Sequence, residues 1–180
     1  MADSISPRKI SAEGQAAYQR GDYLAAVEHF RAAASAYEAL PDRLMAAEMR
    51  NNASVAQLQA GNAAAALVEV DGTAEIFAAA GDVRRQAMAA GNQAAALEGL
   101  KRTDEALEAY ELSADLFQQA GEPDLRLHAL KAMSALQLES GRRLQALATM
   151  KAGLDDLKKP TLKQRFLQRL LNIPFRMWNK

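Results

Sequence analysis

The chain has 180 residues, of which 49% are hydrophobic and only 6% aromatic, and 40 of them are alanines. Alanine is the best helix former, while β-branched residues and prolines are scarce, so the composition predicts an all-α fold. The absence of cysteine excludes disulfides, zinc–thiolate sites and thiol nucleophiles. No run of 18 apolar residues occurs and the N-terminus lacks the apolar core of a signal peptide, so we expect a soluble, cytoplasmic protein.

The net charge of zero conceals an asymmetry along the chain. Residues 158–180 contain seven basic residues and no acidic one, which gives this segment a charge of +7. The other 15 basic residues face 22 acidic residues, so residues 1–157 carry −7. An acidic body with a basic tail calls for an explanation.

An internal repeat of 40 residues runs through most of the chain. Its turn position holds Gly21, Gly61, Lys101 and Gly141. Small and apolar residues recur in the same register, in five rows: Gly14, Ser54, Ala94 and Ser134; Ala26, Ala66, Ala106 and Ala146; Val27, Leu67, Leu107 and Leu147; Phe30, Val70, Tyr110 and Met150; and Tyr37, Phe77, Phe117 and Leu157. The rows predict small residues where paired helices cross and larger ones between successive hairpins.

Each repeat consists of a helix A, a tight turn and a helix B. The stop and start signals predict helices, in chain order, at 7–20, 23–40, 42–60, 63–80, 83–99, 103–120, 123–140 and 143–158. Ser6 before Pro7 is a candidate cap for the first helix, and Thr103 with Asp104 for the helix at 103–120.

A basic amphipathic helix is predicted after Pro160, where Thr161 and Gln164 can form a capping box. Its apolar stripe consists of Leu162, Phe166 and Leu170, widened by Leu167 and Leu171, and its basic residues outside the stripe are Lys163, Arg165 and Arg169. Pro174 is expected to end this helix. The repeat frame makes it the start of a fifth helix A, with Leu167 and Leu170 in the positions of Leu127 and Leu130.

These elements predict a right-handed α-solenoid of four antiparallel helical hairpins plus a C-terminal capping helix. The expected segments are an N-terminal extension (1–6), four repeats (7–42, 43–82, 83–122 and 123–158) and a basic capping helix with tail (159–180). The A helices should form the concave side.

The rows resemble the tetratricopeptide repeat (TPR) family, whose Gly–turn–Ala–aromatic arrangement is matched by Gly21, Ala26 and Phe30. The period is 40 rather than 34, the early tryptophan of helix A is absent, and Lys101 replaces a glycine. The long repeats are similar to those of kinesin light chains and spindle-orientation adaptors. That resemblance implies a groove in which Asn52 and Asn92, nine residues before the turn position, contact a peptide backbone. The outer repeats have Ala12 and Ala132 there.

Chaperone-binding members of the family use a clamp for a terminal carboxylate, but its Asn position falls here on Val55 and Ala95. The resemblance therefore implies a protein-protein interaction scaffold or adaptor that binds a peptide or helix, rather than a chain terminus. The candidate groove residues are Asn51, Asn52, Val55, Met88, Asn92, His128 and Lys131. Other expected concave positions are Arg8, Ser11, Gln15, Glu48, Gly91, Ala95 and Ala135.

Two features of this face can be explained by helix packing as well as by ligand binding. The side-chain amides of Asn52 and Asn92 can instead form hydrogen bonds between adjacent A helices. Gly91 in mid-helix fits either the close approach of a ligand or a constraint on helix packing.

No pattern points to an enzyme, and no cofactor or metal is expected. His29 and His128 lack ligand spacing, and neither GxxxxGK[ST] nor GxGxxG occurs. An acidic stripe, formed by Asp104, Glu108, Glu111 and Asp115, fits a solvated outer face or a docking strip for a basic partner.

The tail admits several functions beyond that of a cap. Candidate contacts with a membrane or partner are Phe166, Arg169, Leu170, Phe175, Arg176 and Trp178. An anionic membrane surface at residues 161–180 would make the protein a peripheral membrane adaptor. Binding of nucleic acid is disfavoured by the −7 body. Charge also allows the tail to cover an acidic patch of its own body.

Overall fold

The computed structural model describes residues 6–40, 42–157 and 159–178, with 173–178 described as backbone alone. These residues form ten α-helices and no strand, which confirms the expected all-α fold. In chain order the helices are α1 (Pro7–Gln19), α2 (Tyr23–Glu38), α3 (Arg43–Gln59), α4 (Ala63–Val70), α5 (Thr73–Ala79), α6 (Val83–Gly99), α7 (Thr103–Gln119), α8 (Pro123–Glu139), α9 (Arg143–Asp155) and α10 (Leu162–Trp178).

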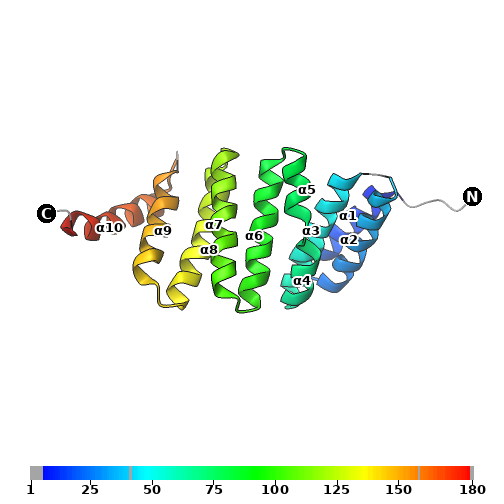
Figure 1. Ribbon diagram of the computed structural model, residues 1–180, viewed down its shortest axis with the longest axis horizontal. Helices are drawn as coiled ribbons and strands as arrows, with labels where there is room; N and C mark the ends of the chain where they lie inside the picture. Colours follow the sequence, from blue (N-terminus) through cyan, green and yellow to red (C-terminus); the bar gives the residue numbers. More distant parts are fainter. Residues whose placement is uncertain (1–5, 41, 158, 179–180) are drawn as a thin grey trace, which may run out of the picture.

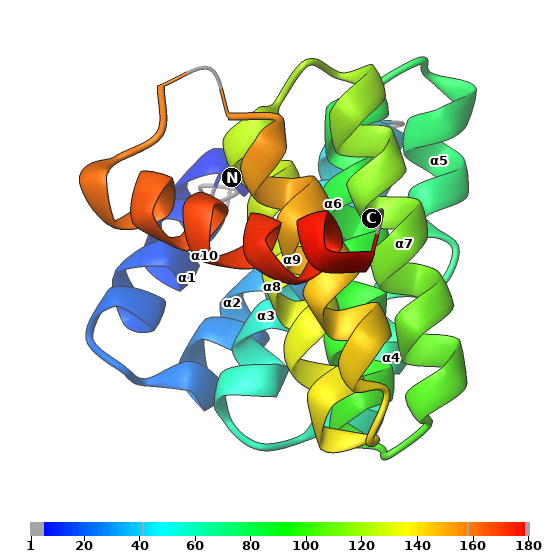
Figure 2. The ribbon, with the colours of Figure 1, turned by 90° about the vertical axis from the view of Figure 1, so that its left-hand side faces the viewer.

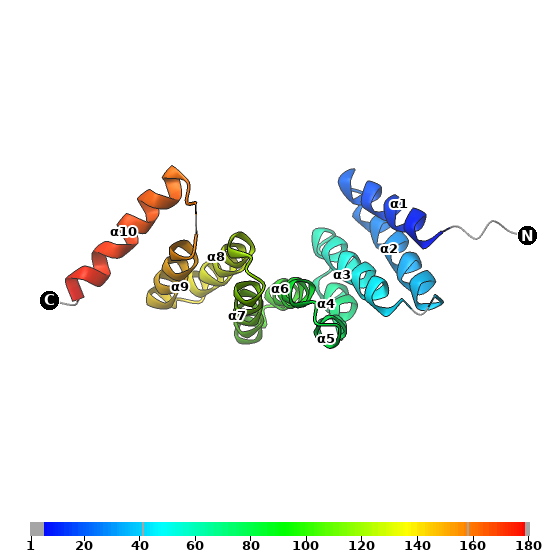
Figure 3. The same cartoon turned by 90° about the horizontal axis from the view of Figure 1, so that it is seen from above.

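The helices stand in a row of antiparallel pairs (Figure 1). Each packs mainly against its neighbours in sequence, with α4 and α5 together in the place of one helix. Seen from above, the row bends into an arc whose inner side is formed by α1, α3, α6 and α8 (Figure 3). The expected right-handed α-solenoid of four helical hairpins with a C-terminal helix is confirmed, and the A helices line its concave side.

The turn within each hairpin repeats one backbone geometry. The residue at the turn position is left-handed, with φ 79° at Gly61 and φ 61° at Lys101, which adopts this conformation without being a glycine. The aspartates that precede helices accept a hydrogen bond from the first turn; Asp82, for example, accepts from the backbone N–H of Arg85 at 2.9 Å. Ser6 occupies the N-cap position of α1 as predicted, whereas the cap predicted at Thr103 is wrong. The side chain of Ser6 makes no capping bond, and Thr103 is the first helical residue after Arg102.

Small side chains occupy the crossings of the paired helices. The row of Gly14, Ser54, Ala94 and Ser134 is buried in all four hairpins. Between hairpins the core is filled by larger residues, among which Phe30 and Phe77 are 2% and 0% exposed. Tyr110 adds a polar link, because its hydroxyl donates to Glu98 Oε2 at 2.6 Å. Burial and this carboxylate raise the pKa of Tyr110 well above its usual range.

The helix predicted at 63–80 is interrupted, so that prediction is wrong. Asp71 is extended (ψ 130°) and Gly72 is left-handed (φ 71°), which separates α4 from α5. The break frees backbone carbonyls at the end of α4, and two side chains bind them. Thr73 Oγ1 donates to the carbonyl of Val70 at 2.7 Å, and Arg50 Nη2 donates to that of Val68 at 3.3 Å. An Asp-Gly pair inside a helical pattern is a turn signal.

The C-terminal helix begins as predicted. Thr161 Oγ1 accepts from the N–H of Gln164, and Gln164 Oε1 accepts from the N–H of Thr161 at 2.6 Å, which is a capping box. The predicted end at Pro174 is wrong, since α10 continues to Trp178. A proline inside a helix removes one hydrogen bond and bends the axis, and the helix can resume beyond it.

α10 packs on α9 but lies across it rather than alongside (Figure 2). Leu167 and Leu171 join the buried Leu154, and Gln168 Nε2 donates to the carbonyl of Leu154 at 2.6 Å. Leu170 is 50% exposed, so the expected correspondence with a fifth helix A fails at this residue. Along the described part of the chain, no helix combines the length and the apolar character that crossing a membrane requires.

Candidate functional site

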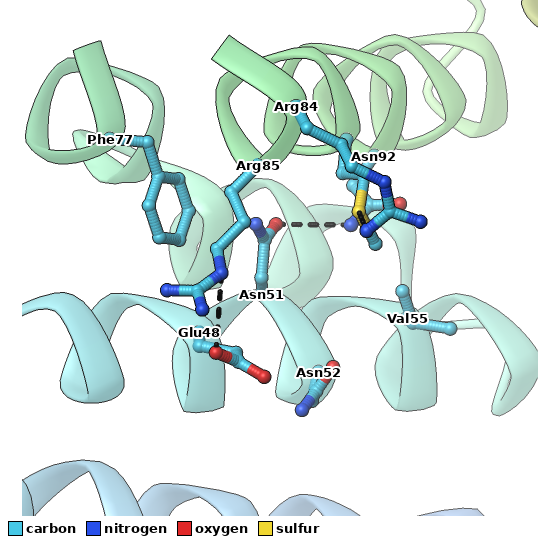
Figure 4. Close-up of a pocket in the computed structure, with 9 residues that line it drawn as sticks. Glu48, Asn51, Asn52, Val55, Phe77, Arg84, Arg85 and Asn92 are labelled. Carbon is cyan, nitrogen blue, oxygen red and sulfur yellow. Dashed lines mark hydrogen bonds and ion pairs between the residues drawn. The ribbon is translucent and has the colours of Figure 1, made fainter. Parts of the chain in front are cut away.

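A hollow of about 170 Å³ lies between α3 and α6 on the inner side of the arc. Its lining residues come mainly from these two helices, with one from α5: Glu48, Asn51, Asn52, Val55, Phe77, Arg84, Arg85, Met88 and Asn92. Figure 4 shows that α3 supplies one wall and α6 the other, while Phe77 stands at one end beside Arg85. The hollow therefore spans the boundary between the second and third hairpins.

An amide pair joins the two walls. Asn92 Nδ2 donates to Asn51 Oδ1 at 3.0 Å (Figure 4). Asn51 is only 6% exposed, so this bond satisfies a buried acceptor and also orients the amide of Asn92. A neutral carboxamide has two N–H donors and an acceptor oxygen, so Asn92 keeps one donor and its acceptor for a ligand.

Asn52 is oriented differently from its neighbour in sequence. It points away from the amide pair in Figure 4, and no hydrogen bond of its side chain is found within the described residues. The structural alternative is a hydrogen bond between side-chain amides of adjacent A helices. It therefore holds for Asn92, which donates to Asn51. It does not hold for Asn52.

The charged groups around the hollow are compensated. Arg85 Nε lies 3.5 Å from Glu48 Oε2 and 3.4 Å from Asp82 Oδ2, and its guanidinium carbon lies 6.0 Å from the ring centroid of Phe77. Arg84 Nε donates to Glu122 Oε1 at 2.9 Å. The arginines are thus already paired with carboxylates, and Val55, Met88 and Phe77 supply apolar walls. Such a lining suits a neutral peptide unit with an apolar side chain better than a free carboxylate.

The structure gathers five of the seven candidate groove residues around this hollow: Asn51, Asn52, Val55, Met88 and Asn92. His128 and Lys131 lie outside it, exposed on α8. Sequence reasoning missed Arg84 and Arg85 in the first turn of α6, although Arg85, Met88 and Asn92 share one helix face at i, i+3 and i+7. Phe77 gave no signal, because it belongs to a core row.

Gly91 packs against a neighbouring helix and does not leave space for a ligand. A Cβ at this position would lie 3.1 Å from Ser113 Oγ on α7, and Ser113 Oγ donates to the carbonyl of Ala87 at 2.8 Å. Gly91 therefore permits close packing of α6 on α7, which is the second of the two explanations.

The tail candidates on α10 are exposed where side chains are described. Phe166 is 69% and Leu170 50% exposed, and Arg169 lies beside them on the surface. The side chains of Phe175, Arg176 and Trp178 lie outside the described part of the structure. The helix α10 lies at the C-terminal end of the row, away from α3 and α6 (Figure 3).

Neither a protein-family model nor a curated protein sequence matches the chain. Solved structures do. A crystal structure of nearly identical TPR-like repeats from a Podosopora anserina putative kinesin light chain is similar with a TM-score of 0.52 and 14% identity, over 97% of this chain and 99% of that one. A crystal structure of a substituted form of those repeats matches with a TM-score of 0.51 and 14% identity, over 92% of each chain. These likenesses show that the chain has the fold of TPR-like repeats.

Proposed function

We propose that the chain is a non-enzymatic interaction scaffold that binds a peptide segment or helix of another protein against α3 and α6. The observation that carries the proposal is the oriented amide of Asn92 beside the apolar walls of Val55 and Met88. A peptide unit offers one donor and one acceptor, and a carboxamide complements both. Because Asn51 holds the amide in place, little conformational freedom is lost when a peptide binds.

The preferred partner segment has a neutral, apolar centre. Arg84 and Arg85 are paired with carboxylates, so an acidic side chain would have to displace Glu122 or Glu48 to reach them. An apolar side chain would instead cover Met88, which is 42% exposed. Asn52, which points away from the amide pair, would contact another part of the segment.

The test compares affinity capture by the wild-type chain and by an Asn52→Ala/Asn92→Ala variant, with quantitative mass spectrometry of the captured proteins. Loss of two amide contacts, at about 1 kcal/mol each, should reduce the recovery of specific partners about tenfold or more. The matched control is Gln118→Ala/Gln119→Ala, which removes two exposed amides of α7 outside the hollow. Circular dichroism confirms that each variant is folded. Equal recovery by all three proteins would refute the groove proposal.

A second candidate function is supported by α10. Leu162, Phe166 and Leu170 are 83%, 69% and 50% exposed in one stripe, and cationic residues flank it. An amphipathic helix of this kind can lie in the surface of an anionic membrane. The chain would then be a cytoplasmic, membrane-peripheral adaptor.

Vesicle flotation tests this candidate. The wild-type chain should float with phosphatidylserine-containing vesicles and not with neutral ones, whereas Leu162→Ser/Phe166→Ser should not float. Leu144→Ser is the control, since Leu144 is 73% exposed on α9 and not on α10. Absence of flotation by the wild-type chain would exclude the membrane function.

A further inference from the structure

A second hollow, of about 520 Å³, lies between α7, α8 and α9, away from the groove. Its apolar surface comes from Leu107 of α7, Met133 of α8 and Ala148 of α9. Glu108 and Glu111 of α7 stand at its rim. The hollow thus combines an apolar floor with an acidic edge.

The two rim carboxylates are uncompensated. Asp104, which also lines the hollow, forms an ion pair with Arg142. Within the described residues, neither Glu108 nor Glu111 forms an ion pair, and both are exposed. A cation approaching the hollow therefore meets two free carboxylates.

A buried polar group also points to a ligand. Gln137 lines the hollow and is only 5% exposed, yet its Oε1 has no hydrogen-bond partner among the described residues. The equivalent Gln57, two hairpins earlier, does have one, because Asn62 Nδ2 donates to its Oε1 at 3.0 Å. In the later hairpin the position of Asn62 is held by Arg142. That side chain is paired with Asp104 instead, so the acceptor of Gln137 lacks its donor.

The chain itself carries a surface that complements this hollow. The inner face of α10 is occupied, since Leu167 and Leu171 pack around Leu154. Its outer face presents the apolar stripe Leu162, Phe166 and Leu170. At the helical repeat of about 3.6 residues per turn, Arg165 and Arg169 flank one side of this stripe and Lys163 the other. This stripe and its three cations are called the α10 outer face.

We propose that the α10 outer face of one molecule docks in the α7–α9 hollow of a second copy. The apolar stripe covers Leu107, Met133 and Ala148, and the guanidinium groups pair with Glu108 and Glu111.

A second copy is required because of the way α10 is held. Its inner face packs on the C-terminal half of α9, so its outer face is turned away from the molecule to which it belongs. Contact between two α10 outer faces would bring their cations together, which opposes that arrangement. The docked surfaces differ from one another, so the contact is head-to-tail and generates rings or chains.

The test uses light scattering coupled to size exclusion, with the full chain at concentrations up to about 100 µM. The wild-type chain should assemble beyond a dimer in about 50 mM NaCl and dissociate in about 500 mM, because ion pairs at an exposed rim are screened. Glu108→Lys/Glu111→Lys and Arg165→Glu/Arg169→Glu should each be monomeric in low salt. Mixed together, these two variants should associate, since the cationic helix of the first meets the acidic hollow of the second.

The control variant is Glu28→Lys/Glu38→Lys, which makes the same change of charge at exposed positions of α2 and should assemble like the wild type. Circular dichroism establishes that all variants are folded. A wild-type chain that stays monomeric in low salt overturns the proposal, as does assembly that survives either charge reversal, or a mixture that does not associate. A monomer that floats with anionic vesicles through Arg165 and Arg169 assigns the α10 outer face to a membrane and likewise overturns it. None of these outcomes bears on the α3–α6 groove.

Discussion

Asn92 on α6 donates a hydrogen bond to the buried side chain of Asn51 on α3, across a distance of 3.0 Å and 41 residues of sequence. The bond links two A helices at the boundary of successive hairpins. It also decides which of two adjacent asparagines is structural, because Asn51 is buried in the pair and Asn52 is not part of it.

Replacing Asn51 by alanine should therefore lower the free energy of unfolding by about 1–2 kcal/mol, through loss of a buried hydrogen bond. Asn52→Ala should change it by less than about 0.5 kcal/mol. Urea unfolding followed by circular dichroism measures both values. Equal destabilisation by the two variants would contradict the assignment.

Glu69 on α4 is a buried carboxylate that forms an ion pair with Arg31. Its side chain is 10% exposed, and Arg31 Nε on α2 donates to its Oε1 at 2.6 Å. Arg31→Met should destabilise the chain by about 1–3 kcal/mol, because it leaves the buried charge of Glu69 unpaired. The cost stays below that of a fully buried pair because the side chain of Arg31 is half-exposed. Adding Glu69→Leu should restore at least half of that loss. If the double variant is less stable than Arg31→Met, the ion pair is not the source of the effect.

Lys101 occupies a left-handed turn position that other hairpins fill with glycine. A residue with a side chain is strained by about 1–2 kcal/mol in the left-handed conformation. Glycine avoids this strain, but it loses more conformational entropy on folding, which offsets part of the gain. Lys101→Gly should therefore raise the free energy of unfolding by about 1 kcal/mol. The reciprocal Gly61→Lys should lower it by a similar amount, and thermal unfolding would report both shifts with opposite sign.

Gly14 is a helical glycine that helix propensity alone would replace by alanine, for a gain of about 1 kcal/mol. A Cβ there would lie 2.9 Å from Phe30 Cδ1 and 3.1 Å from His29 Cβ. Phe30 is 2% exposed, so the added methyl group should overpack this part of the core, at a cost of about 1–3 kcal/mol that outweighs the gain. Gly14→Ala should thus be less stable than the wild type in urea, while Gln15→Ala, at the exposed neighbour, should be nearly neutral. A stabilised Gly14→Ala would show that propensity dominates.

Most of the fold could be predicted because its signals are local and repeated. The turn position, the small-residue row and the large apolar rows recur every 40 residues, so each hairpin supports the assignment of the others. The errors fall where one hairpin departs from the repeat. Helix formers surround Asp71-Gly72 and predict an uninterrupted helix there, and Pro174 predicts a helix end although a helix can continue past a proline.

The candidate site could be predicted less completely. The A-helix face led to Asn51, Asn52, Val55, Met88 and Asn92, because residues three and four apart share a face. Helix periodicity gave no reason to separate Asn51 from Asn52, and the resemblance, which singled out Asn52, did not indicate that Asn51 pairs with Asn92. The A-helix face also extended the groove to His128 and Lys131, which lie beyond the hollow on another helix.

The sequence by itself determined the all-α hairpin architecture and the charge asymmetry, because periodicity, turn chemistry and net charge are properties of short stretches of chain. Only the tertiary structure decided which polar groups are satisfied. Three features depend on side chains from different helices: the pairing of Asn92 with Asn51, the closeness of Gly91 to Ser113, and the Oε1 of Gln137, which has no partner in the described part of the chain. Such contacts are fixed by how the helices pack, to within a fraction of an ångström, and no local pattern carries that information.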